Sequence, residues 1–421
     1  MQGPKGKTRV LIYSDCTFFA GCENMPANLL NSPGIKREFD ISFAYRESAE
    51  YSAGLAGRVE AGARTIPVFI PAVEALKGAL ERSGLRVVSE LFRFTGLFLV
   101  LKYIFALYAF VALFFLFRRL KPEILHINNG GYPGAYSCVS AVFAARAAGI
   151  RRVVFVVNNI AVPYARFTRR LEKGIDRLLA RRVDLFVTGS EYAGARLREV
   201  LNVPLERTLT IPNGIAARPA KESRAAVLAR LGIPENSVIL GTVAVLEPRK
   251  GHKYLLEAMA RVKDKFPGFK EVVLLIEGVG PERGSLERLA ADLGIAANVR
   301  FLGREKNVFD VMRTFDVFVL PSIGYEDFPN VVLEAMSLGK PVIGTRLAGI
   351  PGQVLDGETG AIVEPADEGA LAGALLRLLT DARGRGEMGR KGLERFNARF
   401  SSGKATENYA ALYRRLAAGD L

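Results

Sequence analysis

The chain has 421 residues, 49% of them hydrophobic and 24% charged, which is typical of a folded globular protein and too long for one ordinary core. Its formal net charge of +15 favours an anionic partner such as nucleic acid, anionic lipid or a sugar nucleotide, and the gathering of aromatic residues in one apolar run disfavours single-stranded nucleic acid. Three cysteines and two histidines exclude a dense disulfide framework and a His-rich zinc site, and they are typical of a reducing compartment.

The first half of the chain reads as short apolar strands separated by helical patterns. We expect strands at 9–14, 40–44, 65–70, 123–127, 153–157 and 184–188. Strands that are apolar on both faces and alternate with helices indicate a parallel sheet covered by helices. The first apolar run, 10–13, is too short for a secretory signal peptide, so we expect the chain to remain in the cytoplasm.

Residues 97–117 form an apolar run, LFLVLKYIFALYAFVALFFLF, whose only charge is Lys102. This run is long enough to span a bilayer, and between 82 and 121 there are seven Lys or Arg against one acid, Glu90. A single crossing would place strands of one sheet on opposite sides of a membrane, where their backbones could not pair. We therefore expect segment 91–118 to insert into the surface of an anionic membrane, with a buried core or dimer helix and a spanning helix as the alternatives.

A second series of strands follows a turn-rich boundary at 211–215. Its strands are expected at 237–243, 271–277, 298–302, 316–320, 341–345 and 360–363. Two such series indicate an α/β protein with two Rossmann-like domains. We place the first domain at 1–212, the second at 213–398, and a terminal helix within 399–421.

The most informative stretch, 321–360, reads PSIGYEDFPNVVLEAMSLGKPVIGTRLAGIPGQVLDGETG. Glu326 and Glu334 stand eight positions apart on either side of a helix start near Asn330. The first backbone N–H groups of a helix lack intrahelical partners and attract anions, so we expect those of Asn330 and Val331 to face phosphates. Two carboxylates beside an anion site suit a ligand with both phosphate and hydroxyl groups, such as a nucleotide sugar.

This stretch resembles the Glu-x7-Glu signature of the family 4 retaining glycosyltransferases. Residues 339–342 and 356–360 also match the family's usual run, and the resemblance is strong from about 211 onward and loose before 123. It implies the GT-B fold, in which two Rossmann-like domains face each other across a cleft and the terminal helix crosses back to the first domain. It also implies that Glu326 is catalytic and lies beside the donor sugar, while Glu334 holds the ribose.

The resemblance extends to residues that would hold the rest of the donor. Lys250, followed by glycine, matches a catalytic lysine that contacts the donor diphosphate in the family. Its ammonium group would stabilise the negative charge on the leaving phosphate group. Val245 stands where the family has arginine, so either Arg249 supplies that charge or leaving-group stabilisation is weaker. Gly352 replaces a usual acid. The donor-binding set includes two glycines and an arginine in loops that would cradle the nucleotide base, unless these are ordinary turns: Gly278, Gly280 and Arg304.

Residues of the first domain would complete the site at the carboxyl ends of the strands. Gly21 is expected to let backbone approach the donor or acceptor. His126 is either a catalytic group that titrates near neutrality or a core residue of its strand. Asn128 and Tyr132 are expected on the acceptor side. Asn158, also placed there, stands where the family often has histidine, which fits a retaining mechanism without an enzyme base.

Together these features predict a retaining hexosyltransferase. It would move a sugar from a UDP- or GDP-sugar to a lipid-linked or cell-envelope glycan, on the cytoplasmic side of the inner membrane, as a peripheral or monotopic protein. No metal is implied, since no Asp-x-Asp pair ends a strand, and no further cofactor or nucleic acid is expected. A non-catalytic sugar-nucleotide-binding subunit and a sugar-nucleotide epimerase of the same fold are the alternatives.

Overall fold

A computed structural model describes residues 6–16, 19, 21–71, 82–83 and 97–420 of the chain. The part of the expected membrane segment that covers 91–96 lies outside the described residues, as do Thr17, Phe18 and Ala20 of the loop after the first strand. The chain divides into two compact units. The first contains 1–189, 193–211 and 406–421, and the second contains 190–192 and 212–405.

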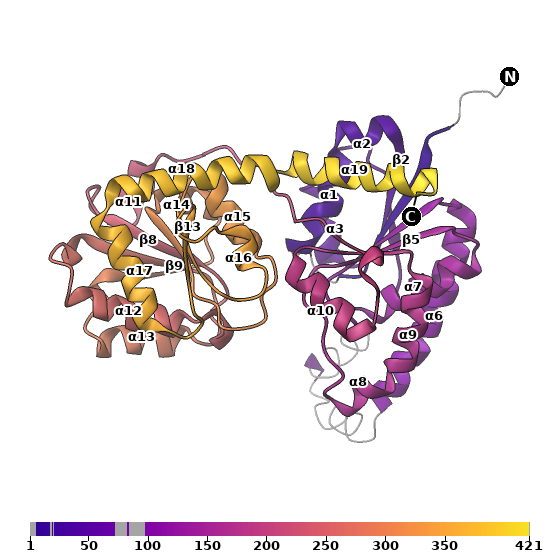
Figure 1. Ribbon diagram of the computed structural model, residues 1–421, viewed down its shortest axis with the longest axis horizontal. Coiled ribbons are helices and arrows are strands. Elements are labelled where there is room, and N and C mark those ends of the chain that lie inside the picture. Colours follow the sequence, from indigo (N-terminus) through magenta and orange to yellow (C-terminus); the bar gives the residue numbers. More distant parts are fainter. Residues whose placement is uncertain (1–5, 17–18, 20, 72–81, 84–96, 421) are drawn as a thin grey trace. The chain divides into compact units, whose positions relative to one another are not determined.

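The first unit is built on a parallel sheet with strand order β3-β2-β1-β4-β5-β6-β7. Two of its strands, β2 and β5, are labelled in Figure 1. The strands are β1 (Thr8–Ser14), β2 (Phe39–Arg46), β3 (Thr65–Val68), β4 (Ile124–Asn129), β5 (Arg152–Val157), β6 (Leu185–Thr188) and β7 (Thr208–Thr210). Residues 10–14 of β1 are all buried, and so are all six residues of β4, because helices cover both faces of the sheet. The six predicted strands are present; β7 was not predicted, because its Thr-Leu-Thr sequence is short and only half-buried.

Helices connect these strands in the order expected for a Rossmann-like unit. They are α1 (Asn24–Asn31), α2 (Pro33–Glu38), α3 (Ala49–Ala56), α6 (Leu97–Leu120), α7 (Tyr136–Ala147), α8 (Phe167–Leu171), α9 (Lys173–Arg182) and α10 (Glu191–Leu201). The core of this unit combines strand residues such as Leu125 and Phe155 with α6 and α7 residues such as Leu113 and Ala141.

The second unit repeats the same topology, with strand order β10-β9-β8-β11-β12-β13. In both sheets the first strand of the unit pairs with the second and the fourth, which is the doubly wound pattern. The strands are β8 (Val238–Val243), β9 (Val272–Glu277), β10 (Val299–Gly303), β11 (Val317–Leu320), β12 (Val342–Thr345) and β13 (Gly360–Val363). The predicted fold class, two Rossmann-like domains, is confirmed.

The helices of the second unit surround its sheet. They are α11 (Arg224–Arg230), α12 (His252–Lys263), α13 (Arg283–Asp292), α14 (Val308–Thr314), α15 (Asn330–Ser337), α16 (Ile350–Gln353), α17 (Glu368–Thr380) and α18 (Ala382–Arg399). The packing of β8 requires glycine at position 241, because a Cβ on Gly241 would lie 2.3 Å from the Phe315 ring. Glycine there lets the ring pack flat against the strand, within a buried cluster that also holds Phe318.

The terminal helix α19 (Ser402–Ala418) begins in the second unit, and its residues from Thr406 onward belong to the first. Its first-unit part packs on the sheet through Tyr409 and Tyr413, which are both buried. Arg414 on its outer side pairs with Glu38 at the end of α2, with Nε 2.7 Å from Oε2. The helix therefore contributes a part of the first unit's core.

Candidate active site

The signature stretch forms a strand, a loop and a helix: β11, residues 321–329, and α15. Glu326 lies in the loop and is only 7% exposed. Its carboxylate forms an ion pair with the Lys250 ammonium and accepts a hydrogen bond of 3.0 Å from the Ser322 hydroxyl. Arg249 Nη1 lies 3.9 Å from the same Glu326 oxygen. Two cations from the loop after β8 therefore meet one carboxylate from the loop after β11.

Gly251 explains how these two loops approach so closely. Its φ of +70° is a left-handed conformation that favours glycine, and a Cβ there would lie 1.9 Å from the Pro321 carbonyl oxygen. The Ile323 N–H donates to the Arg249 carbonyl at 2.8 Å, which ties the two backbones together. The glycine after the predicted lysine thus brings the ammonium to the carboxylate.

The N-terminus of α15 lies between the two signature acids in the sequence. Asn330 is its first residue, and the Asn330 Oδ1 accepts a hydrogen bond of 3.4 Å from Asn213 Nδ2. Glu334 is its fifth residue and is half-buried, whereas Val331 follows Asn330 with its side chain also half-buried. The positive end of the helix dipole is therefore next to the loop that carries Glu326.

Asp327 is a buried acid that the sequence analysis missed. It is 4% exposed, and its Oδ2 has no hydrogen-bond partner within the described part of the chain. Burial, together with the charge of the neighbouring Glu326, raises the pKa of Asp327 from 3.8 to about 6. Only burial distinguishes this acid from a surface one, and burial in a loop leaves no periodic pattern in the sequence.

The glycines expected near the nucleotide base have a structural reason of their own. A Cβ on Gly278 would lie 1.9 Å from the Ala244 carbonyl oxygen, and one on Gly280 would lie 2.4 Å from that of Leu246. These glycines let the loop after β9 pack against the loop after β8, so close packing of ordinary turns is sufficient to explain them. Arg304 follows β10 and is exposed, as a donor-binding residue would have to be.

His126 is a core residue, which contradicts the catalytic alternative. Its side chain is buried in β4, its Nδ1 lies 2.6 Å from the Tyr413 hydroxyl, and its ring stacks on Tyr409 at 5.2 Å between centroids. Burial lowers the pKa of His126 to about 3, so the imidazole stays neutral at physiological pH. No surface of the ring is left for a substrate.

The acceptor-side expectations are only partly compatible with the structure. Tyr132 is 1% exposed and its hydroxyl donates to Asp176 Oδ1 at 2.9 Å, so its predicted contact with an acceptor is wrong. Asn128 is also buried: its amide donates to Glu23 Oε1 at 3.1 Å, and its Oδ1 accepts from Asn158 Nδ2 at 2.8 Å. Asn158 is half-buried at the end of β5 and lies closest of the three to solvent.

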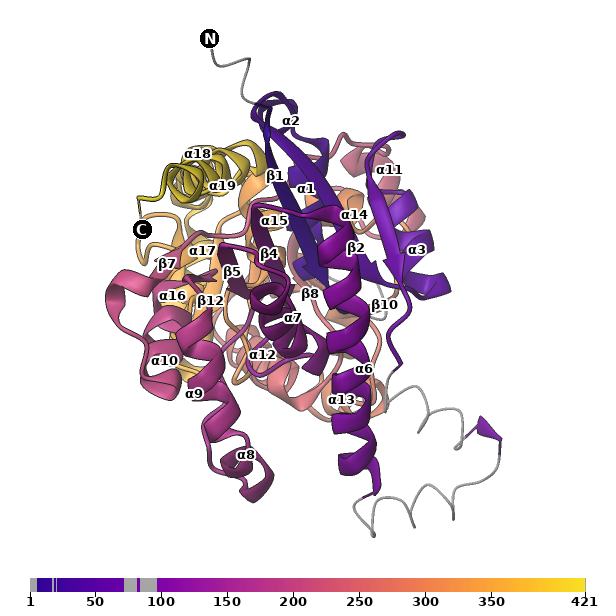
Figure 2. The same cartoon turned by 90° about the vertical axis from the view of Figure 1, so that its right-hand side faces the viewer.

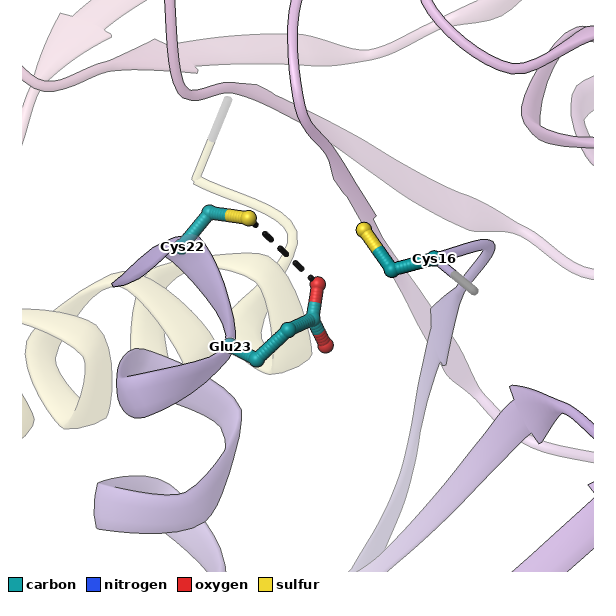
Figure 3. Close-up of side chains that lie close together, drawn as sticks. All are labelled: Cys16, Cys22 and Glu23. Carbon is teal, nitrogen blue, oxygen red and sulfur yellow. Dashed lines mark hydrogen bonds between the residues drawn. The ribbon is translucent and has the colours of Figure 1, made fainter. Parts of the chain in front are cut away.

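Gly21 starts a short helical turn, and the residues beside it form a cluster that was not predicted from the sequence. Cys16, Cys22 and Glu23 place their ligand atoms within 4.8 Å of one another, with both thiols turned toward the carboxylate (Figure 3). Glu23 is 1% exposed, and burial raises the pKa of its carboxyl group. Within the described residues, these three are the group whose atoms could hold a soft metal ion.

The Glu23 carboxylate already has protein partners, which gives the cluster a structural role. It accepts hydrogen bonds from the hydroxyls of Ser14, at 2.8 Å, and Tyr51, and from the Asn128 amide. These donors come from β1, α3 and β4. The carboxylate therefore fixes the loop that carries Gly21 to the carboxyl ends of the strands.

The apolar run forms the helix α6, one face of which is buried and the other exposed. Ala109, Leu113 and Phe117 are buried, and α6 packs against α7. Leu113 and Phe117 belong to the core of the first unit. Within the described residues, Val100–Leu120 is long and apolar enough to cross a bilayer, with a mean hydropathy of 2.3, and only 17% of its 18-residue apolar window is buried. A fully buried core helix is therefore contradicted.

Two known protein families match long stretches of the chain. Residues 237–381 match the family described as "Glycosyl transferases group 1", and 48–214 match the "Glycosyl transferase 4-like domain". The chain is 34% identical over 184 residues to the lipopolysaccharide core biosynthesis glycosyltransferase LpsE of Rhizobium meliloti, which covers 44% of this chain and 52% of that protein. It is 30% identical over 258 residues to a GDP-mannose-dependent alpha-(1-6)-phosphatidylinositol monomannoside mannosyltransferase of Mycolicibacterium smegmatis, covering 58% and 65%. The matches thus span between half and two thirds of these relatives.

Solved structures share the fold along nearly the whole chain. A crystal structure of HepE from Anabaena in complex with UDP has a TM-score of 0.73 at 17% identity, covering 97% of this chain and 100% of that one. The lipopolysaccharide outer core galactosyltransferase WaaB has a TM-score of 0.64 at 16% identity, covering 98% and 100%.

Proposed function

Because the chain belongs to the family 4 glycosyltransferases of the GT-B fold, we propose that it transfers a hexose from a nucleotide-diphosphate sugar to a lipid-linked or cell-envelope glycan at the membrane surface. The observation that carries this proposal is the contact between Lys250 and Glu326. A cation for the diphosphate and a carboxylate for the sugar meet there, in the loop before the N-terminus of α15.

The second unit supplies the donor site in this proposal. Lys250 and Arg249 hold the diphosphate, Glu326 accepts hydrogen bonds from sugar hydroxyls, and Glu334 accepts them from the ribose. Val245 is 41% exposed and carries no charge, but Arg249 Nη1 lies 3.9 Å from Glu326 Oε1 and can supply the charge that this valine lacks. The first N–H groups of α15 favour the phosphates.

The proposed reaction retains the configuration of the sugar. The bond between the anomeric carbon and the phosphate oxygen breaks, and a bond to the acceptor oxygen forms on the same face. The acceptor hydroxyl proton passes to the departing phosphate oxygen, so no enzyme base is required, and Asn158 fits a site without a base. Lys250 stabilises the negative charge that develops on the leaving nucleoside diphosphate. No metal or further cofactor enters this scheme.

Two relatives support the classes of donor and acceptor. The M. smegmatis enzyme is named for GDP-mannose and for a phosphatidylinositol monomannoside, which is a lipid acceptor, and LpsE is named for lipopolysaccharide core biosynthesis. For the present chain we propose a UDP- or GDP-sugar donor and an acceptor anchored in the cytoplasmic face of the inner membrane. The exposed apolar face of α6 supports peripheral or monotopic attachment there.

A turnover assay tests the proposal. Purified protein, mixed with membrane extract and each UDP- or GDP-sugar, should release nucleoside diphosphate with at least one donor. Glu326→Gln should lower the rate by about a hundredfold or more, because a transition-state contact is lost. Glu364→Gln is the matched control, since Glu364 is an exposed acid of the same unit paired with Arg346 at 2.7 Å. Release unaffected by Glu326→Gln would contradict the proposal.

The two alternatives give different results in the same assay. A non-catalytic subunit would bind the donor without releasing nucleoside diphosphate in any extract. An epimerase would interconvert donor sugars without an acceptor.

A further inference from the structure

In the first unit, α7 lies between α6 and the α8–α9 segment (Figure 2). Residues of these helices line an apolar groove, with α7 as its floor and with α6 and the α8–α9 segment as its walls. Its volume is about 210 Å³. The groove is lined by apolar side chains of three helices: Tyr103 and Ala106 of α6, Val139 and Phe143 of α7, and Ile175 of α9. Sites for whole drug-sized ligands are larger, roughly 300 Å³ or more. The groove therefore suits an extended apolar part of a ligand, such as one hydrocarbon chain.

The polar groups in the groove wall are already paired with protein groups. Lys102 Nζ of α6 lies 2.6 Å from Glu172 Oε1 on the opposite wall. Asp176 accepts hydrogen bonds of 2.9 and 2.8 Å from two tyrosines. The Ser140 hydroxyl of α7 donates to the Ala106 carbonyl at 2.8 Å. An apolar guest would leave none of these groups unsatisfied, so it could enter without that penalty.

Both rims of the groove carry exposed apolar side chains. On α6 these residues are spaced for one helical face and are 43–65% exposed: Val100, Ile104, Leu107, Val111 and Phe115. On the α8–α9 segment they are 42–73% exposed: Phe167, Leu171 and Leu178. Exposed apolar side chains gathered on one helical face are typical of a contact with a membrane or a partner.

The charges of the α8–α9 rim favour an anionic bilayer. The stretch 166–181, all of it described, exposes five basic side chains: Arg166, Arg170, Lys173, Arg177 and Arg181. Its two acids, Glu172 and Asp176, are turned inward, where Arg169 Nη1 lies 3.0 and 2.5 Å from their oxygens. A second copy of this surface would face five like charges, whereas anionic headgroups would neutralise them.

The groove also leads to the part of the fold where an acceptor is expected. Pro133 and Gly134 line it and follow β4 in the sequence. Asn129, the last residue of β4, fixes that loop: its amide donates to the Pro133 carbonyl at 3.1 Å and its Oδ1 accepts from the Ala135 N–H at 3.2 Å. A chain in the groove would thus have one end near the carboxyl ends of the strands.

We propose that this groove binds one hydrocarbon chain of the lipid acceptor, while the two rims rest in the headgroup boundary of an anionic bilayer. This inference rests on the proposed glycosyltransferase function and specifies its acceptor as an anionic lipid with a flexible chain. The basic rim holds headgroup phosphates, and the apolar walls remove the chain from water.

The binding of soluble amphiphiles to the full chain tests the groove directly. Isothermal titration calorimetry would compare inorganic phosphate, butyl phosphate and decyl phosphate, the last below its micelle concentration. Affinity should rise roughly three- to fourfold for each added methylene group until the groove is filled. An affinity that does not depend on chain length would overturn the proposal.

Two matched pairs of variants locate the chain. Ile175 and Leu178 lie on α9 and are 41% and 42% exposed, but Ile175 lines the groove and Leu178 does not. Ile175→Asp should weaken the binding of decyl phosphate at least about tenfold, and Leu178→Asp less than about threefold. A carboxylate in the groove would lose its hydration beside the hydrocarbon chain, and its charge would repel the phosphate. On α6, Tyr103→Ala and Tyr108→Ala give the same contrast, since these side chains are 43% and 45% exposed and only Tyr103 lines the groove.

Vesicle binding tests the role of the rims separately from chain binding in the groove. In co-sedimentation with phosphatidylglycerol vesicles, Ile175→Asp and Leu178→Asp should both lower the bound fraction, and phosphatidylcholine vesicles should bind less of the unchanged protein. Equal loss of decyl phosphate affinity in both variants would overturn the chain site, as would no loss in Ile175→Asp. Unchanged melting temperatures would confirm that the variants fold.

The donor distinguishes a failure of this inference from a failure of the proposed function. Ile175→Asp should retain the thermal shift produced by the donor nucleotide sugar, because Ile175 belongs to the first unit and the proposed donor residues to the second. If no nucleotide sugar binds the unchanged protein, the proposed function fails, whatever the amphiphile result. If the donor binds and decyl phosphate does not, only the groove assignment fails.

Discussion

Replacing Gly251 by alanine should disrupt the donor site through backbone geometry alone. Any L-residue at a φ of +70° loses roughly 1 kcal/mol relative to glycine. The new Cβ would also lie 1.9 Å from the Pro321 carbonyl oxygen, so the loops after β8 and β11 must separate. Separation breaks the hydrogen bond of 2.8 Å from Ile323 N–H to the Arg249 carbonyl, worth about 1 kcal/mol, and weakens the ion pair of Lys250 with the buried Glu326.

Gly232 provides a matched control for the conformational part of this effect. Its φ is +65°, and a Cβ there would have no heavy atom within 4 Å. Gly232→Ala should therefore lower the free energy of unfolding by about 1 kcal/mol, and Gly251→Ala by about 3 kcal/mol or more. Urea unfolding followed by circular dichroism measures both values, and calorimetry measures the affinity for the donor nucleotide, which only Gly251→Ala should reduce. Equal destabilisation of the two variants, with donor affinity unchanged, would refute this explanation of the loop contact.

Three further changes test buried ionisable groups. Lys250→Met should lower the free energy of unfolding by about 1–3 kcal/mol because Glu326 loses its main partner, and a double-mutant cycle with Glu326→Gln should show coupling of at least about 1 kcal/mol. Burial raises the pKa of Asp327 from 3.8 to about 6, so the stability it contributes is complete below pH 3.8 and is lost as pH rises through 6. Asp327→Asn should remove that loss, up to about 3 kcal/mol at pH 8, as urea titrations between pH 4 and 8 would show. Burial lowers the pKa of His126 from 6.5 to about 3, so the stability that this residue contributes to the protein is complete above pH 6.5 and is lost as the pH falls toward 3. His126→Phe should reduce the loss in the free energy of unfolding as the pH falls from 7 to 4.5. An unchanged pH dependence over this range would contradict the assignment of His126 to the core.

The strands of both sheets could be predicted from the sequence because burial on both faces leaves continuous apolar runs such as Val272–Glu277. The short edge strand Thr208–Thr210 carries no such run. The apolar run was predicted to meet a membrane, but the sequence could not show which of its residues pack on α7, because apolar residues surround the whole helix.

Local sequence matches identified the residues of the second unit that the structure places around Glu326. Lys250 and Glu326 lie 76 positions apart, yet each belongs to a recognisable loop. The first unit was harder to interpret, because the surroundings of its residues depend on distant segments. His126 is covered by Tyr413, which lies 287 positions later, and Tyr132 donates to Asp176. Neither contact leaves a local pattern, and the same is true of the groove between α6 and α9.

Direct donor binding tests the central assignment of Lys250, Glu326 and Glu334 most simply. Calorimetric titration of the full chain with UDP-, GDP- and ADP-sugars should reveal binding of at least one donor. Glu334→Ala should weaken that binding at least about tenfold by removing the ribose contact. Glu364→Ala, on an exposed acid of the same unit, should leave it unchanged. If no sugar nucleotide binds, or if both variants bind the donor as well as the unchanged protein does, the donor site lies elsewhere and the account is wrong.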